Sequence, residues 1–385
     1  MARYEIARSY LHRKLTHEVN YMSTEYGKNL KISIYGGSHD DHIGIYAKNL
    51  PKGFEFSLTE LLEFLARRAP GKNEFSTQRK EPDMPELLSG VSIDGDKITL
   101  NGDELHAIIR NTSQRSSDYA QDSFIPRPSH ADFTARMKYG ENVDLRGGGH
   151  FSGRLTAPLC IVGGICIQYL RSLGIEIRAH VYSIGSVKDT PFDATNLSMS
   201  DFNLLDSRKD FPTLLLESAE LMKQEINSAR LDGDSIGGVI ECAALGLPIG
   251  LGEHIFDGVE NRISSIVFGI PAVKGIEFGN GFECATLRGS QNNDCFEITD
   301  GKIRTKTNNC GGILGGMTNG MPLIFRAAMK PTPSIFKEQQ SVDMVNMTPT
   351  TLTIKGRHDP CIVLRAVPVF EAAAAIAICD MLLDQ

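Results

Sequence analysis

The chain has 385 residues, 41% of them hydrophobic, which is enough for one large domain or two. Its formal net charge is −7 at pH 7, so general binding to nucleic acid or to an anionic membrane surface is not expected. The eight cysteines include no C-x-x-C pair, and we predict reduced thiols in a cytoplasmic protein rather than disulfides or a zinc site. We expect no membrane span, because no apolar run reaches roughly 18 residues without polar interruption.

Residues 1–22 form a basic, amphipathic N-terminal extension with a weak structural signal. Glu5, Glu18 and a single serine argue against a transit peptide, which avoids acidic residues. An upstream start or artificial addition and a native extension both remain open. Residues 23–385 are predicted to form one domain.

The first strand signal is KISIYGG at residues 31–37, and Ser38 and His39 follow it directly. A histidine at a strand end can serve as a general acid or base, although a structural hydrogen bond is the more common role. His42 adds no metal site, because no third ligand has a recognisable spacing.

The next element is a helix over residues 57–71, with a capping box at Ser57 and Glu60 and a stop at Pro70. Basic residues crowd its end and the loop that follows. They can complement the helix dipole or bind a phosphate or carboxylate. They are Arg67, Arg68, Lys72, Arg79 and Lys80.

The most unusual stretch is RGGGHFSGRLT, residues 146–156, shortly after His130 in RPSHADFT. Three glycines indicate positive φ angles, a tight turn or the close approach of a ligand. The apolar run that follows predicts a buried helix starting near Ser152 and stopping at Gly174. A glycine loop before a helix is typical of anion sites, and an ordinary turn stays open.

Further strands are predicted at residues 97–100, 237–245 and 323–329, and further helices at 214–234 and 370–383. Mixed strands and helices give an α+β or α/β protein. CGGILGGMTNG, residues 310–320, lacks the spacing of a dinucleotide-binding loop. The acidic, glycine-containing loops lack EF-hand spacing, so no metal site is expected.

These stretches, in this order, resemble the chorismate synthase family. GGSHD, RRAPG, STQRKEPD, NTSQRSSDY, RPSHADFT, KYG with RGGGHFSGRLTA, KPTPSI and GRHDPC parallel its motifs from about Tyr26 to the C-terminus. The resemblance implies an α+β fold, a β-α-β sandwich with a helical core between antiparallel sheets, assembled as a homotetramer. It also implies anti-1,4-elimination of phosphate from 5-enolpyruvylshikimate 3-phosphate to give chorismate, with reduced FMN as cofactor and no net redox change.

Roles carry over with the motifs. By family likeness His130 protonates the leaving phosphate, His39 protonates the reduced flavin, and Asp359 takes a proton from flavin N5. The implied substrate contacts are Ser38, Arg67, Arg68, Arg79 and Arg154. The implied FMN contacts are His150, Phe151, Ser152, Pro271, Ala272, Gly315, Lys330, Pro331, Thr332, Pro333, Ser334 and Arg357.

The chain departs from the family pattern at Asp40, Glu74, His150, Phe151 and Pro271. No inserted segment can be assigned to flavin reduction by NADPH, so the reductant is expected to come from a separate system. Two other functional classes predict different sequence features. A non-catalytic flavin- or phosphate-binding protein would lack His39, His130 or Asp359, and a phosphatase or kinase would carry a metal-carboxylate or P-loop motif.

Overall fold

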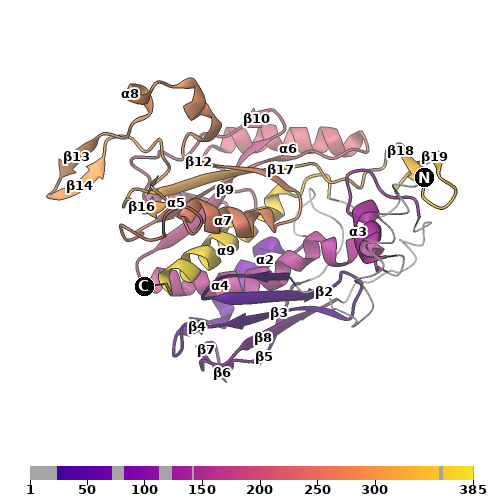
Figure 1. Ribbon diagram of the computed structural model, residues 1–385, viewed down its shortest axis with the longest axis horizontal. Helices are drawn as coiled ribbons and strands as arrows, with labels where there is room; N and C mark the ends of the chain where they lie inside the picture. Colours follow the sequence, from indigo (N-terminus) through magenta and orange to yellow (C-terminus); the bar gives the residue numbers. More distant parts are fainter. Residues whose placement is uncertain (1–23, 72–81, 112–123, 141–142, 355–358, 385) are drawn as a thin grey trace.

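The fold is a sandwich of two antiparallel sheets around a layer of helices (Figure 1). This computed structural model describes residues 24–71, 82–111, 124–140, 143–354 and 359–384. The five-stranded first sheet has the order β1-β2-β3-β8-β5 and comprises β1 (Thr24–Tyr26), β2 (Lys31–Gly36), β3 (His42–Lys48), β8 (Leu105–Arg110) and β5 (Pro85–Ser89). The second has the order β10-β9-β11-β17-β12 and comprises β10 (Val187–Lys188), β9 (Glu176–Ile184), β11 (Gly238–Leu245), β17 (Leu323–Met329) and β12 (Val273–Phe278).

Shorter strands decorate the two sheets. A three-stranded sheet of β4 (Glu55–Ser57), β7 (Lys97–Leu100) and β6 (Val91–Asp94) lies beside the first sheet. Three hairpins follow later in the chain: β13 (Phe296–Thr299) with β14 (Lys302–Thr305), β15 (Ile313–Leu314) with β16 (Met317–Thr318), and β18 (Gln339–Asp343) with β19 (Thr348–Leu352). In Figure 1 the β13–β14 hairpin and α8 (Gly289–Asn292) extend away from the sandwich.

The helical layer consists mainly of α2 (Leu58–Arg68), α4 (Thr156–Ser172) and α9 (Val363–Leu382), with α7 (Val259–Phe268) beside them (Figure 1). Most residues of α4 and nearly all residues of α9 are buried, which is the pattern of a helix between two sheets. Helices α5 (Met199–Ser207) and α6 (Leu216–Leu231) cover the outer side of the second sheet, and α3 (Asp132–Tyr139) lies near one end. The predicted α+β sandwich is therefore confirmed.

Most element predictions hold, with shifts at the boundaries. Ser57 caps α2 by accepting the Glu60 N–H, but the box is not reciprocal, because the Ser57 N–H bonds to Gln168 of α4 at 2.8 Å. α4 begins at Thr156 rather than near Ser152, since two short 3-10 turns, η2 (Arg146–Phe151) and η3 (Gly153–Leu155), precede it. α9 starts before the predicted residue 370 and accommodates Pro368 in its second turn.

The segment Gly153–Ser172 is long and apolar enough to span a membrane, contrary to the expectation from the sequence. Of its most apolar 18-residue window, 83% is buried inside the protein, as expected for a helix between two sheets. All eight cysteines are free thiols, as predicted. Burial raises the pKa of Cys160 and of Cys361 to about 12, so both stay protonated at neutral pH.

Candidate active site

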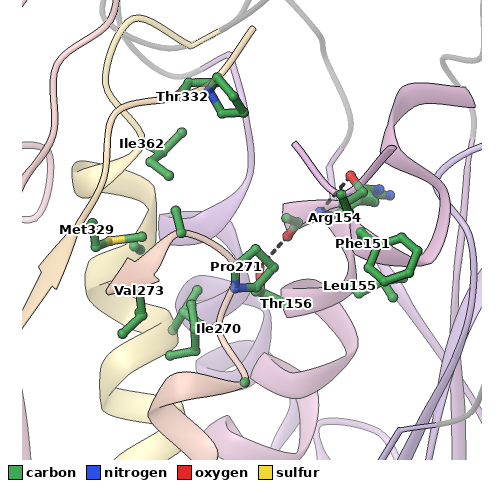
Figure 2. Close-up of a pocket in the computed structure, with 18 of the residues that line it drawn as sticks. Phe151, Arg154, Leu155, Thr156, Ile270, Pro271, Val273, Met329, Thr332 and Ile362 are labelled. Carbon is green, nitrogen blue, oxygen red and sulfur yellow. Dashed lines mark hydrogen bonds between the residues drawn. The ribbon is translucent and has the colours of Figure 1, made fainter. Parts of the chain in front are cut away.

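One cavity of about 710 Å³ lies where the start of α4 and the start of α9 meet the loops that follow α2, α7 and β17. This volume lies within the roughly 300–1,000 Å³ typical of small-molecule sites. Segments far apart in the sequence thus contribute to one wall, as Figure 2 shows for residues around Phe151, Ile270 and Thr332. The predicted site residues that line it are Arg68, His130, His150, Phe151, Ser152, Arg154, Pro271, Ala272, Lys330, Thr332, Pro333, Ser334 and Asp359.

The cavity is rich in basic side chains although the whole chain is acidic. Its only carboxylate among the described lining residues is Asp359. Two more carboxylates, of Asp83 and Asp132, are hydrogen-bonded to lining arginines. The basic side chains still outnumber these carboxylates by three, which favours an anionic ligand with several charges. They are Arg68, Arg127, Arg154, Lys274, Lys330 and Arg365.

Asp83 fixes two of the lining arginines. One oxygen of its carboxylate accepts a hydrogen bond from Nε of Arg68 at 2.6 Å. The other oxygen accepts a hydrogen bond from Nη1 of Arg154. Burial alone would raise the pKa of Asp83, but the charges of Arg68 and Arg154 outweigh it and hold this pKa below its ordinary value. Two guanidinium groups share one carboxylate, so the trio presents one net positive charge.

His130 belongs to a cluster at the start of α3. Its Nδ1 lies 2.7 Å from Oδ1 of Asp132, and the Arg127 Nε and Nη2 both donate to the same carboxylate at 2.7 Å. A carboxylate only accepts, so Nδ1 carries a proton and Nε2 is the nitrogen that can exchange one with a ligand. Burial of Asp132 is outweighed by the hydrogen bonds from Arg127 and His130, which lower the pKa of this carboxyl.

The glycine loop packs against the stretch that follows β2. A Cβ on Gly147, whose φ is 56°, would lie 2.6 Å from Nε2 of His39, so only glycine fits there. The Ser38 N–H donates to Gly149 O at 3.2 Å, and the Ser38 hydroxyl donates to Arg146 O at 3.0 Å. His39 and Ser38 are thus buried directly behind the cavity-lining Gly147. The close approach of His39 therefore explains at least the first of the three glycines without any ligand.

His150 is tied on both sides. Its Nδ1 donates to Gly36 O at 2.9 Å, and its Nε2 accepts from the Thr24 hydroxyl at 2.9 Å. This pairing fits the neutral imidazole with its proton on Nδ1, because a carbonyl only accepts. His150 therefore joins β1 and the end of β2 to the glycine loop while it lines the cavity.

Asp359 stands at the entrance to α9. Its Oδ2 accepts Nη1 of Arg365 at 2.5 Å, and Nε of Arg365 donates to the backbone oxygen of Arg68 at 3.1 Å. The Asp359 side chain is only 10% exposed. Arg365 thus connects the predicted catalytic carboxylate to the arginine-bearing end of α2.

Another part of the cavity wall has an apolar region followed along the chain by a basic one. Ile270, Pro271 and Val273 from the turn between α7 and β12 face the cavity together with Met329 and Ile362 (Figure 2). Beyond Met329 the chain continues into the predicted run from Lys330 to Ser334. Lys330 Nζ donates to Ser129 O, which links this run to the loop that carries His130. Burial and the nearby charge of Lys274 lower the pKa of Lys330.

Some predicted residues lie elsewhere. Both terminal nitrogens of Arg67 donate to Glu371 of α9, at 2.6 and 2.9 Å, so this arginine occupies a core ion pair outside the lining. Gly315 lies in the β15–β16 turn, next to the start of α7, whereas the cavity touches the end of α7. Pro331 is exposed and absent from the lining. Arg79 and Arg357 lie outside the described residues.

Sequence reasoning assigned no role to several polar residues that shape this site: Asp83, Arg127, Asp132, Lys274 and Arg365. The signal for three of them was present in the quoted motifs, since Asp83 closes STQRKEPD and Arg127 and Asp132 flank His130 in RPSHADFT. Lys274 and Arg365 also lie in stretches that resemble the family, AVKG and RAVPVFEA, but only the folded chain shows that they reach the cavity.

Comparison with known proteins is consistent over nearly the whole length. A sequence model described as chorismate synthase matches residues 30–383. A chorismate synthase of Lancefieldella parvula is 44% identical over 370 residues, covering 94% of this chain and 96% of its own. One of Thermococcus kodakarensis is 45% identical over 358 residues, covering 93% and 97%.

A solved structure entitled "Crystal Structure of Chorismate Synthase" superimposes with a TM-score of 0.72 at 29% identity, and the match covers 93% of each chain. Fold, sequence and motif order therefore agree. The chain belongs to the chorismate synthase family and is a carbon–oxygen lyase.

Proposed function

We propose that this enzyme eliminates phosphate from 5-enolpyruvylshikimate 3-phosphate to form chorismate, with reduced FMN as cofactor. The observation that carries the proposal is the excess of basic side chains around one cavity in a chain whose net charge is −7. A substrate with one phosphate and two carboxylates matches such a wall, because guanidinium groups bind both kinds of anion in a fork geometry.

The cavity wall fits a flavin mononucleotide in three respects. The apolar surface of Ile270, Pro271, Val273 and Met329 suits a planar ring system. The Thr332 hydroxyl oxygen is buried and has no hydrogen-bond partner among the described residues, so it has a bond to offer a ligand. Lys274 and Lys330 lie close by, ready to bind a phosphate group.

The residues of this chain then divide the work. Arg68 and Arg154, fixed by Asp83, bind an anionic group of the substrate and stabilise the charge that develops as the C–O bond breaks. His130, protonated on both nitrogens with its Nδ1–H directed at Asp132, donates the Nε2 proton to the departing phosphate and is left as the neutral Nδ1–H ring. When bound, reduced FMN would supply an electron-rich ring system for the reaction.

Two further groups serve proton transfer in this proposal. Asp359, held by Arg365, is the carboxylate of the wall that can accept a proton. His39, behind Gly147, is the imidazole of the opposite loop and is proposed to keep the cofactor in the correct protonation state.

Several wider properties belong to the same proposal. Residues 23–385 form one domain that assembles with identical copies into a tetramer in the cytoplasm. Reduced FMN is supplied by a separate system that draws on NADPH or another reductant. Light scattering of the purified chain tests the assembly, and NADPH oxidation by the chain with FMN tests the reductant.

The decisive experiment is an anaerobic assay with the substrate and dithionite-reduced FMN. Chorismate, followed by its absorbance, and free phosphate should form together and in equal molar amounts. Oxidised FMN and a reaction without flavin are the controls, and neither should support turnover. Equal turnover in those controls would exclude the proposed cofactor requirement, whereas phosphate release without chorismate would exclude the proposed reaction.

A further inference from the structure

We infer that Asp132 is a positioning residue: it holds the Nδ1 proton of His130, so that the doubly protonated ring gives up its Nε2 proton and is left as the neutral Nδ1–H tautomer. This inference rests on the proposed role of His130 as general acid. It concerns a residue that the motif comparison left without a role. The geometry of three side chains on one short segment, residues 127–132, supports it.

His130 and Asp132 share one proton. Nδ1 of His130 and Oδ1 of Asp132 are 2.7 Å apart, and a proton must lie between them because two lone pairs would repel at that distance. Asp132 stays ionised, since its pKa is lowered. The proton therefore belongs to Nδ1, and Nε2 is left to face a ligand.

Asp132 also excludes a competing hydrogen bond from Arg127 to His130. Nη2 of Arg127 lies 3.1 Å from Nδ1 of His130, close enough to donate to it. That bond would make Nδ1 an acceptor, and the ring would then be neutral with its only proton on Nε2. Such a ring could donate only by becoming an imidazolate, so it is a far weaker acid than the doubly protonated ring. Asp132 prevents this, because it draws Nε, Nη2 and the backbone N–H of Arg127 as well as Nδ1 of His130 toward its own oxygens.

Nε2 of His130 points toward the glycine loop. A Cβ on Gly148 would lie 3.5 Å from Nε2 of His130, so the ring is directed at the glycine loop that lines the cavity. The side chains of His130 and Asp132 are 15% and 9% exposed. Asp132 is thus shielded from solvent and reaches the reaction only through the imidazole.

The test is a double-mutant cycle on the full chain with reduced FMN. Asp132→Asn keeps the shape of the side chain and removes its charge. We expect it to lower kcat at least about tenfold with little change in KM, because a misdirected proton affects the transition state more than binding. In the His130→Ala background the same substitution should cost nothing further, since Asp132 acts through that ring.

A spectroscopic measurement separates positioning from a loss of structure. With ¹⁵N-labelled histidine, the His130 signal is identified by its absence from His130→Ala. In the parent enzyme the neutral His130 ring should be in the Nδ1–H form. In Asp132→Asn it should shift toward the Nε2–H form. Asp201→Asn is the matched control, because Asp201 has a similar place in the first turn of α5 and accepts from Ser198, away from the cavity.

The outcomes are distinct. A normal kcat in Asp132→Asn, an unchanged tautomer, or full additivity with His130→Ala overturns the inference while chorismate formation stands. Full activity of His130→Ala removes the general acid and the inference with it. Absence of chorismate from the parent enzyme instead contradicts the proposed function itself.

Discussion

At the scale of single residues, the cavity shows how one chain gives chemically similar side chains different tasks. His130 has one ring nitrogen fixed by a carboxylate and the other directed at the glycine loop, whereas both nitrogens of His150 are bound within the protein. Arg68 lines the cavity and Arg67, its neighbour in sequence, pairs with Glu371 in the core. The residue type alone does not decide the role; its partners do.

The two histidines should therefore respond differently to removal. His130→Ala should lower turnover by roughly 10²–10⁴-fold with little change in affinity for FMN or substrate, the range for a lost general acid. His150→Ala should weaken FMN binding and leave saturated turnover within about tenfold, because it loosens the wall without removing a proton donor. Steady-state kinetics and FMN titrations of both variants provide the comparison. The reverse pattern would contradict both assignments.

Asp83 should make a pH-dependent contribution to stability. Its folded-state pKa is depressed, so its stabilisation is present above the unfolded value of about 3.9 and is lost as pH falls through the folded value. Asp83→Asn leaves two guanidinium groups without a shared carboxylate and should cost about 3–5 kcal/mol at pH 7. Urea unfolding at pH 7 and at successively more acidic pH should show this difference shrinking.

Glu86→Gln is a suitable control for Asp83. Glu86 also pairs with an arginine, Arg110, but at the exposed surface, where such pairs contribute little. Its replacement should leave the unfolding curve nearly unchanged at pH 7. A loss for Asp83→Asn no larger than for Glu86→Gln would show that the buried trio is not a structural anchor.

At the scale of elements, the sandwich depends on how closely α4 approaches α9. A Cβ on Gly163 of α4 would lie 2.2 Å from Cβ of Ala372 and 2.5 Å from its Cα. The two helices touch backbone to backbone there, with alanines along α9 and glycine on α4. The starts of both helices border the cavity.

Gly163→Ala should therefore destabilise the protein despite the better helix propensity of alanine, which alone would favour the variant by about 1 kcal/mol. Overpacking of this kind costs about 1–3 kcal/mol. Denaturant unfolding measures it. Gly289→Ala in α8 is the control, because no atom lies within 4 Å of its added Cβ, and it should be neutral or stabilising. Adding Ala372→Gly to Gly163→Ala should restore part of the loss, and failure to do so would contradict the close contact.

The sequence predicted the elements better than their ends or their order. The strands at residues 31–37, 97–100, 237–245 and 323–329 and the helices were recognisable from local patterns. The true start of α4 was not, since positive φ angles at three successive glycines turn the chain before Thr156. Nor was the sheet order, because strand pairing such as that of β11 with β17 depends on contacts distant in sequence.

The site was predictable to the extent that motifs carry it. His130, Asp359 and Arg154 were chosen from motifs and do line one cavity. Their partners Asp132, Arg365 and Asp83 were not chosen, since a carboxylate or guanidinium near a motif is usually a solvated charge. Arg67 illustrates the converse, because adjacent arginines on a helix face different directions and only one can reach the cavity.

At the scale of the whole molecule, the charge distribution is uneven in a useful way. The chain is acidic overall, yet the basic side chains of one cavity outnumber the carboxylates that line or directly pair with them by three. The two sheets hold the start of α4 and of α9 against that cavity. An anionic ligand is therefore attracted to one place, and general binding of polyanions is disfavoured.

Substrate and FMN should consequently bind as coupled ligands. The apolar wall at Pro271 and the basic side chains belong to a single cavity of about 710 Å³, so a substrate on the arginines would cover one face of a bound flavin. Covering that face removes apolar surface from water and should tighten FMN binding about 5–150-fold, the usual range of coupling between sites. The effect must be reciprocal, because the free energy of the ternary complex does not depend on the order of binding.

Fluorescence titrations of FMN with and without substrate, and of substrate with and without FMN, measure both directions. Equal FMN affinity in the two conditions would show that the ligands occupy separate sites, and the proposed arrangement of the cavity would then be wrong.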